Sequence, residues 1–440
     1  MRSKLASIRV ATRATILSVS AAVSAFAVEP QDWVDTHLTG LVKTYQWLHA
    51  NPEVSYEEKA TANHIAKSWE KSGYKVTTGV GGYGVVGILK NGDGPTLMLR
   101  CDLDALPVTE QTPLPFASTK MVEVPGRGAT GVMHACGHDV HMTNLIGVAQ
   151  YLAEHLSKWS GTLMLVGQPA EERGGGAKAM LREGLFERFE KPDYALAVHV
   201  CSKTPAGSVA LMPGYALANV DSVDITVKGR GGHGSAPHTT IDPIVQAASL
   251  VMTLQTIVSR EVKPIEPAVV TVGSIHGGTK HNVIGDECRL QITVRTYSDQ
   301  VRAQVLSAIE RQAKANAMLF GAPEPIIQIG GGTPSLENDD ELASRLREVF
   351  IETLGEDRVI IDEPSMGGED FSRYGKEGVP IVLYRVGSVE KARLDRFASM
   401  RLPPPSLHSS TYYPDIDLTL ETGIKTLVAA ALDLLKKPAS

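Results

Sequence analysis

The chain has 440 residues, of which 43% are hydrophobic and 21% are charged, and this composition is typical of a globular protein with about two or three domains. Its formal net charge is −6 and its pI is near 6.1. Nucleic acid and anionic membrane surfaces both require clustered excess Lys and Arg, so we expect neither as a partner.

The first thirty residues differ from the rest of the chain. Basic residues precede an apolar run without acidic residues, from Ala14 to Ala27, and small residues stand two apart at Ala25 and Ala27. This pattern predicts a secretory signal peptide over residues 1–27, and therefore an exported protein in the periplasm or the medium of a bacterium. The alternative is a membrane anchor, but the run has about 14 residues and a membrane span requires about 20.

Hydrophobic periodicity in the remaining chain alternates between helical and extended segments. Helices are predicted at 33–51, 56–73, 140–157 and 177–189, and short apolar strands at 85–89, 96–101, 162–166 and 194–198. This alternation predicts an α/β domain whose sheet is buried, because the strands are continuous apolar runs. Functional sites in such sheets form at the carboxyl ends of the strands.

A second unit begins near Asn219, where the order of elements changes. Strands are predicted at 220–229, 268–275, 288–296 and 326–329, and helices at 242–260 and 298–319. This β-α-β-β-α-β order is that of ferredoxin-like domains. We therefore predict an inserted domain over residues 219–332 and a discontinuous first domain over 28–218 and 333–440. A helix at 339–354 and a strand at 379–384 would return the chain to the first domain.

Metal-ligand residue types are concentrated between His134 and His141, a segment with three histidines, one cysteine and one carboxylate. Gly137 lets the backbone bend between Cys136 and His138, so the thiolate and the imidazole can reach one centre or neighbouring centres. Both ligands suit borderline-soft ions such as Zn²⁺. Taken alone, the segment also fits a redox or structural cysteine beside surface histidines.

Further candidates follow two of the predicted strands. Glu171 and Glu172 come after strand 162–166, and adjacent carboxylates point in different directions, so one can bind metal while the other acts as a general base. Without other evidence, a solvated acidic loop is the better interpretation of such a pair. His199 follows strand 194–198, and His408 lies in a distant segment where an exposed loop histidine is the alternative.

The chain resembles the metallopeptidase family that contains hippurate hydrolase, bacterial N-acyl-amino-acid amidohydrolases and plant auxin-conjugate hydrolases. The resemblance extends over nearly the whole mature chain and is carried by residues 48–53, 100–108, 134–141, 168–172, 232–237, 282–283 and 367–371. It implies a two-layered catalytic α/β domain of the aminopeptidase-like (zinc exopeptidase) type, with an inserted ferredoxin-like α+β domain that serves as lid and dimerisation domain.

The resemblance also implies a role for individual residues. Two divalent metal ions per subunit would be bound by Cys136, His138, Glu172, His199 and His408. Zn²⁺ suits these ligands, and Mn²⁺, Co²⁺ and Ni²⁺ bind similar sites. Glu171 would be the base that activates a metal-bound water, and Asp104 would orient the metal ligands. His233 would reach into a neighbouring subunit's site, which implies a homodimer or a higher oligomer. Asn282 and Arg295 would hold the substrate's carbonyl oxygen or carboxylate.

The expected substrate is a small molecule, an N-acyl amino acid with an aromatic or aliphatic acyl group. Hydrolysis of its amide bond would release a carboxylic acid and a free amino acid. Two alternatives remain: a dipeptidase or carboxypeptidase on the same scaffold, and a metal-binding protein without catalysis. Cys101 stands where relatives carry a small residue, and we expect it in the core. Segment 388–406 would either shape the acyl pocket or form a surface loop.

Overall fold

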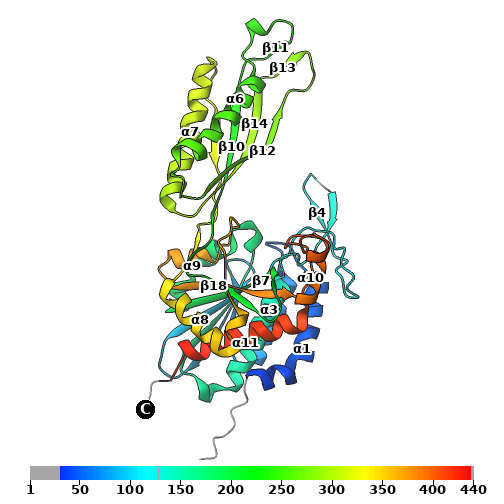
Figure 1. Ribbon diagram of the computed structural model, residues 1–440, viewed down its shortest axis with the longest axis vertical. Helices are drawn as coiled ribbons and strands as arrows, with labels where there is room; N and C mark the ends of the chain where they lie inside the picture. Colours follow the sequence, from blue (N-terminus) through cyan, green and yellow to red (C-terminus); the bar gives the residue numbers. More distant parts are fainter. Residues whose placement is uncertain (1–29, 127, 438–440) are drawn as a thin grey trace, which may run out of the picture.

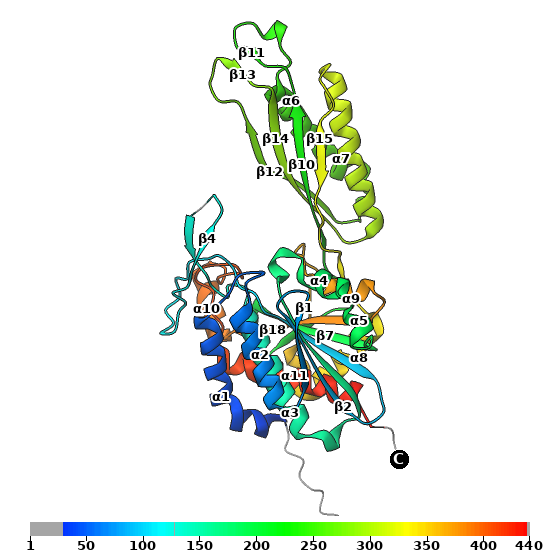
Figure 2. The same cartoon turned by 180° about the vertical axis from the view of Figure 1, so that it is seen from behind.

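The computed structural model describes residues 30–126 and 128–437, so the signal peptide predicted for residues 1–27 lies outside the described residues. Figure 1 shows a large α/β domain and a smaller insert that stands away from it. The chain enters and leaves the insert through segments that lie side by side (Figures 1 and 2). Among the described residues, no helix has both the length and the apolar character that crossing a membrane requires.

A single eight-stranded mixed sheet forms the centre of the large domain. Its strands are β1 (Lys75–Val80), β2 (Gly84–Asn91), β3 (Thr96–Asp102), β6 (Gly161–Gln168), β7 (Tyr194–Pro205), β8 (Val209–Leu211), β17 (Val359–Ile361) and β18 (Ile381–Val389). Their order is β1-β2-β6-β3-β7-β18-β8-β17. The four central strands, β6, β3, β7 and β18, are mutually parallel. Their carboxyl ends therefore meet along one edge of the sheet.

Helices cover both faces of this sheet. One face packs against α1 (Pro30–Ala50), α2 (Lys59–Lys71), α3 (His138–Glu154), α8 (Asp340–Leu354) and α11 (Ile416–Leu434), and the other against α4 (Gly176–Arg182), α5 (Leu185–Arg188) and α9 (Ser372–Lys376). Leu97 and Leu99 point into the first core and Met98 into the second. The α/β class is confirmed. A sheet buried on both faces needs a helical layer on each, so the domain has three layers where two were expected.

The insert contains a four-stranded antiparallel sheet with two helices on one face. Its elements are β10 (Asn219–Lys228), α6 (Pro243–Thr256), β12 (Ala268–Gly277), β14 (Glu287–Thr296), α7 (Asp299–Leu319) and β15 (Ile326–Ile329). The strand order is β12-β14-β10-β15. Buried and less buried residues alternate along β10 and β14, as expected for a sheet that is covered on one face only. This is the predicted ferredoxin-like arrangement.

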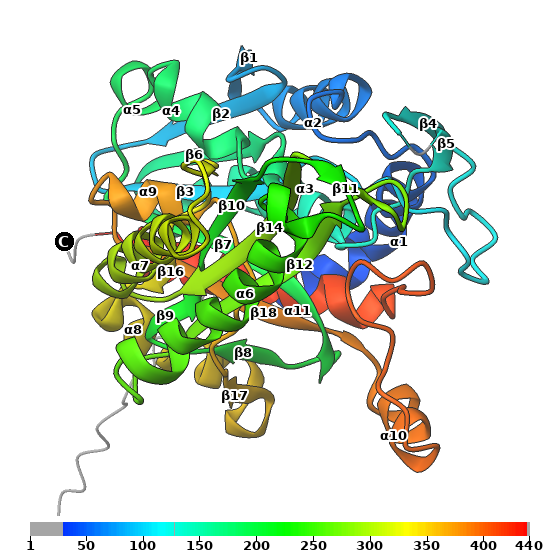
Figure 3. The same cartoon turned by 90° about the horizontal axis from the view of Figure 1, so that it is seen from above.

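Two very short strands, β11 (Gly232–His233) and β13 (Val283–Ile284), pair at the tip of the insert. Figures 1 and 2 place this tip at the end of the insert that is farthest from the large domain. In Figure 3 the insert projects over the central strands of the large sheet. The remaining strands are β4 (Met121–Val124), β5 (Gly128–Gly131), β9 (Gly214–Leu217) and β16 (Leu336–Asn338), and the remaining α-helix is α10 (Lys391–Ser399), which forms part of the segment 388–406.

Candidate metal centre

A tight turn before α3 places the first two candidate ligands. Gly137 has φ 78°, in the left-handed region, and a Cβ atom at this position would lie 2.5 Å from the Val200 side chain. Only glycine therefore fits between Cys136 and His138. His138 begins α3, and its Nδ1 lies 2.7 Å from the backbone oxygen of Asp104, which leaves Nε2 directed to the site. Although burial lowers the pKa of His138, the Asp102 and Asp104 carboxylates raise it well above its usual value.

Glu171 and Glu172 lie on a short 3-10 turn that follows β6. The residue before them, Ala170, has φ 48°, a conformation that a non-glycine residue adopts only under constraint. The constraint is visible: Glu58 Oε1 accepts from Ala170 N at 2.7 Å. The two oxygens of the Asp104 carboxylate accept from Glu171 N at 3.2 Å and from Glu172 N at 3.1 Å. Asp104 therefore orients both glutamates through their backbone N–H groups.

The structure brings the five predicted ligands together. Cys136 Sγ lies 3.5 Å from His199 Nε2 and 3.2 Å from His408 Nε2. Glu172 Oε1 lies 3.4 Å from His408 Nε2 and 3.9 Å from His138 Nε2. His408 has φ 68°, so its backbone is constrained in the same way as that of Ala170. These contacts place Cys136 between two imidazoles, at the middle of the cluster.

This set of side chains fits divalent metal ions. His138 Nε2 and Glu172 Oε1 are buried without a hydrogen-bond partner, and such orphaned groups are costly unless something binds them. Burial and the nearby Glu172 carboxylate raise the pKa of the Cys136 thiol well above its usual range. Burial also raises the pKa of Glu172 to about 7. Bound cations would reverse these shifts, and thiolate, imidazole and carboxylate are the ligands of Zn²⁺ and related ions.

The position of His199 differs from the expectation in one respect. We expected this residue at the carboxyl end of a strand that stops at residue 198. Instead β7 continues to Pro205, because β18 pairs with it beyond this point, at Gly387 with Cys201 and at Val389 with Pro205. His199 therefore projects from within a strand. Its imidazole Nδ1 lies 2.9 Å from the Val200 oxygen, and Nε2 faces Cys136.

A buried charged network behind the ligands was not predicted. Arg100, which is 3% exposed, lies 2.9 Å from Asp102, 2.8 Å from Glu369 and 3.2 Å from Asp370. Asp102 Oδ1 in turn lies 2.7 Å from Nδ1 of His141. A buried arginine and an aspartate within one apolar strand were a usable signal, because buried charges are almost always paired.

His141 belongs to this network and not to the ligand set. Although Asp102, His138, His141 and His199 offer atoms within 4.8 Å of one another, both nitrogens of His141 have partners. Nδ1 pairs with Asp102, and Nε2 accepts from Val200 N at 2.9 Å.

Burial and the Glu369 and Glu172 carboxylates raise the pKa of Glu171 well above its usual range. The predicted base thus stands between the ligand cluster and the Arg100 network.

The three predicted site residues of the insert are not brought to this cluster within one chain. His233 and Asn282 lie at the tip, beside β11 and β13, and the tip is remote from the large domain (Figure 2). Arg295 lies near the other end of β14, where its Nε donates to Thr293 Oγ1 at 3.1 Å. Burial lowers the pKa of Arg295, although the Asp221 carboxylate opposes this shift.

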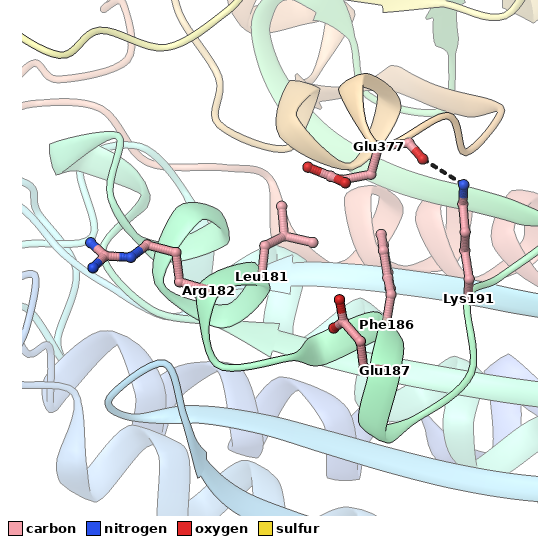
Figure 4. Close-up of a pocket in the computed structure, with 6 residues that line it drawn as sticks. All are labelled: Leu181, Arg182, Phe186, Glu187, Lys191 and Glu377. Atoms are coloured by element: carbon pink, nitrogen blue, oxygen red, sulfur yellow. Dashed lines mark hydrogen bonds between the residues drawn. The ribbon is translucent and has the colours of Figure 1, made fainter.

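Figure 4 shows a surface pocket elsewhere on the large domain. It is lined by Leu181, Arg182, Phe186, Glu187, Lys191 and Glu377, with Lys191 Nζ donating to the Glu377 backbone oxygen at 2.5 Å. None of these residues belongs to the ligand cluster or to the Arg100 network. The pocket lies beside α4, α5 and α9, which cover the sheet face opposite to α3. It is therefore distinct from the candidate metal centre.

Similar proteins place this geometry in a known family. Residues 98–398 match the peptidase family M20/M25/M40. Hippurate hydrolase of Campylobacter jejuni is 40% identical over 331 residues, which are 74% of this chain and 82% of that protein. Thermostable carboxypeptidase 2 of Saccharolobus solfataricus is 35% identical over 350 residues, 79% of this chain and 84% of that protein.

A solved structure agrees with the sequence relatives. The crystal structure of the Bacillus subtilis YXEP protein, a dinuclear metal binding peptidase from the M20 family, superposes with a TM-score of 0.73 and 28% identity. The match covers 91% of this chain and 99% of that chain. The protein is thus an enzyme, a hydrolase with the fold of dinuclear metal-binding peptidases. The chain belongs to the peptidase family M20/M25/M40.

Proposed function

We propose that the protein hydrolyses the amide bond of N-acyl amino acids and releases a carboxylic acid and a free amino acid. The observation that carries this proposal is the position of Glu171, a carboxylate within 4.8 Å of both His138 and Glu172. A protein that only carries metal needs ligands but no base beside them. The similarity to hippurate hydrolase supports acyl amino acids as the substrate class.

We propose that two divalent ions are held by Cys136, His138, Glu172, His199 and His408. Zn²⁺ is the ion we propose first, and Mn²⁺, Co²⁺ and Ni²⁺ are the alternatives. Bound ions would lower the pKa of a water molecule and polarise the amide carbonyl. Glu171 would take the proton of that water on its carboxylate and return it to the leaving amine.

The insert would supply groups that bind the substrate. Ser235 N donates to His233 Nδ1 at 3.1 Å, so a neutral His233 carries its proton on Nε2. This proton suits stabilisation of the oxyanion, and because the tip is remote from its own metal centre, we propose that the donor is His233 of the partner subunit in a homodimer. Asn282 would hold the carbonyl oxygen, and the Arg295 guanidinium would pair with the free carboxylate.

The proposal is tested by Glu171→Gln, which keeps the size and one oxygen of the side chain but removes the base. We expect the variant to bind as much metal as the parent while hydrolysis of benzoylglycine falls by about 10²- to 10⁴-fold. The matched control is Glu172→Gln, which removes a proposed ligand and is expected to lose metal as well as activity. Metal is measured by elemental analysis. Unchanged turnover of Glu171→Gln would eliminate the mechanism.

The carboxypeptidase alternative is favoured by one observation, the similarity to thermostable carboxypeptidase 2. A substrate panel separates the two functions. We expect faster release of free amino acid from benzoyl, acetyl and longer acyl donors than from dipeptides and peptides, measured as kcat/KM for each substrate. A preference for peptides would establish the alternative.

Subunit exchange tests the dimer. A His233→Ala protein and a Glu171→Gln protein, each inactive alone, are mixed under conditions that exchange subunits. Each hybrid dimer would contain one site with an intact base and an intact donor, so activity is expected to return. Failure to recover activity in verified hybrids would show that His233 does not act across subunits.

We also propose that residues 1–27 direct export and are removed. The basic start, the apolar run and the small residues at Ala25 and Ala27 support this proposal. Sequencing the amino terminus of protein recovered from the periplasm or the medium of a bacterial host tests it, with Val28 expected as the first residue. Retention of the protein inside the cytoplasm would contradict it.

A further inference from the structure

A buried histidine lies behind the metal centre and contacts no proposed ligand. His49, in the last turn of α1, is 1% exposed. Its Nδ1 lies 2.7 Å from Asp139 Oδ2 and its Nε2 lies 3.0 Å from Glu110 Oε1. A carboxylate can only accept, so both ring nitrogens must donate and the ring must carry a proton on each. Burial lowers the pKa of His49, but the hydrogen bonds to Asp139 and Glu110 outweigh it and raise the pKa to about 9.

His49 links Asp139 to Glu110, and the Asp139 end of this hydrogen-bonded series fixes the start of α3. Asp139 follows His138 in the sequence, and its Oδ1 accepts from Val140 N at 2.9 Å. The other carboxylate oxygen is held by His49. The first turn of α3 is therefore fixed to α1 through a charged hydrogen bond, and His138 is the residue that begins this turn. Rotation of the turn would move His138 Nε2 away from the cluster.

The Glu110 end controls the segment that carries His408. Glu110 Oε2 accepts from Ser118 N at 2.6 Å, and Oε1 accepts also from Thr112 Oγ1, so this carboxylate organises the loop over residues 110–118. The neighbouring Gln111 N donates to Ser410 O at 2.8 Å, two residues beyond His408. The loop thus links His49 to the segment that presents His408.

His49 joins two ligands that are 270 positions apart in the numbering of the chain, at 138 and 408. Its other neighbours are aromatic: the Tyr45 hydroxyl lies 3.5 Å from Nδ1, and the edge of the Phe116 ring meets the imidazole with centroids 5.5 Å apart. These rings exclude water from the ion pairs and leave the two carboxylates as its charged contacts. An imidazole with both nitrogens occupied in this way cannot bind metal.

We propose that His49 is a positioning residue that fixes the metal ligands His138 and His408 relative to each other by joining Asp139 to Glu110. The inference rests on the metal centre of the proposed function. Residues that orient metal ligands in this indirect way affect metal affinity by about 10- to 100-fold when they are substituted. His49→Gln carries no charge, and both of its N–H donors sit on one nitrogen, so it cannot replace two ring nitrogens that face different carboxylates.

The experiment compares the metal-free full-length parent, His49→Gln and a control, each titrated with Zn²⁺ and with Co²⁺. The control is His37→Gln, because His37 lies on the same helix and its Nδ1 contacts only the Trp33 oxygen of that helix, at 2.8 Å. We expect His49→Gln to bind at least one of the two ions about 10- to 100-fold more weakly and to change the visible spectrum of bound Co²⁺. The control is expected to match the parent in both measurements.

Each outcome supports or overturns a stated claim. A parent that does not bind two ions would overturn the proposed metal centre. A parent that binds two ions beside a His49→Gln protein with the same affinities and the same Co²⁺ spectrum would overturn the positioning role alone. A structural role of His49 without positioning would lower the stability of the metal-free protein and leave both readouts unchanged. Urea unfolding of the metal-free proteins is therefore measured in parallel.

A second variant covers the case in which His49→Gln does not fold. Glu110→Gln leaves the pair between His49 and Asp139 in place and weakens only the connection to the loop at 110–118. We expect it to shift the same ion affinity in the same direction. In the double variant, the loss is expected not to exceed the larger single loss, because both changes break one connection. Unchanged affinity in Glu110→Gln would overturn the proposal as well.

Discussion

The ligand edge of the large domain and the tip of the insert each carry predicted site residues, but they are constructed in opposite ways. In the large domain, Arg100, Asp102, Glu369 and Asp370 are at most 3% exposed, and the Arg100 guanidinium contacts each of the three carboxylates directly. At the tip, His233 is exposed, and its Nδ1 contacts the Ser235 hydroxyl, two residues away in the sequence. The charged groups of the first region are paired inside the fold, whereas His233 in the second is exposed to solvent.

The difference has a physical origin. A buried charge must be compensated inside the fold, so the residues around the metal ligands are fixed before any substrate arrives. Exposed groups are solvated, so they need no partner inside the fold and remain available to bind a partner subunit or a substrate. Substitutions in the first region should therefore change stability as well as function, and substitutions in the second should change function alone. Three predictions test this contrast, in order of their expected effect on the free energy of unfolding.

The largest loss is expected for Arg100→Leu. Removal of the guanidinium leaves the buried Glu369 and Asp370 carboxylates without their cation and removes one partner of Asp102, and breaking a buried ion pair in this way costs about 3–5 kcal/mol. Urea unfolding followed by tryptophan emission measures it, because the four tryptophans all lie in the large domain. The control is Arg289→Leu in the insert, where the pair with Glu287 is solvent-exposed and a much smaller change is expected; it is followed by far-UV circular dichroism, because the insert contains no tryptophan. Equal losses of stability for the two substitutions would contradict the difference between the buried and the exposed region.

An intermediate effect is expected from the titration of His49. Its folded pKa of about 9 lies above the ordinary 6.5, so its contribution is fully present below pH 6.5 and is lost as the pH rises through 9. The contribution is up to about 3 kcal/mol. We expect the stability difference between the metal-free parent and metal-free His49→Gln to shrink over this range, as measured by urea unfolding at several pH values. A difference that does not depend on pH would mean that His49 is neutral in the folded protein.

Much of the fold follows from local pattern. The last strand of the insert was predicted at the residues where β15 lies, because its apolar run is short and bounded by turn residues. The short edge strands β8 and β17 were missed because their identity depends on distant partners, and the helix α11 was missed although its hydrogen bonds are local. The predicted helix over 177–189 is divided at Gly184, whose φ of 82° ends α4 and begins α5.

In the candidate site, too, residues with a local sequence signal were predicted and most residues with distant partners were not. Residues that lie at or near strand ends, such as Glu172 and His199, were found because ligand types at these places are conspicuous in a sequence. Asp104 was predicted from the family resemblance, but the other residues that support the ligands were missed because their partners are remote: Arg100 and Glu369 are 269 positions apart, and Glu58 and Ala170 are 112 apart. No local pattern records such a pairing. Only the fold that joins β3, β6 and the segment before α9 creates it.

The smallest effect on stability is expected for His233→Ala. The side chain is exposed and its Nδ1 contacts only Ser235, so the free energy of unfolding should change by less than about 0.5 kcal/mol, with metal content unchanged. Loss of the proposed oxyanion donor should nevertheless lower kcat by about 10²- to 10³-fold. Ser235→Ala is the control, since it keeps the backbone N–H that fixes the tautomer of His233, and it should remain close to the parent in kcat. Unfolding is followed by far-UV circular dichroism, which includes the insert. If His233→Ala lost stability and activity together, the tip would be a structural element like the ligand edge, and the contrast between the two regions would fail. If it lost neither, the oxyanion donor would have to be sought in the large domain.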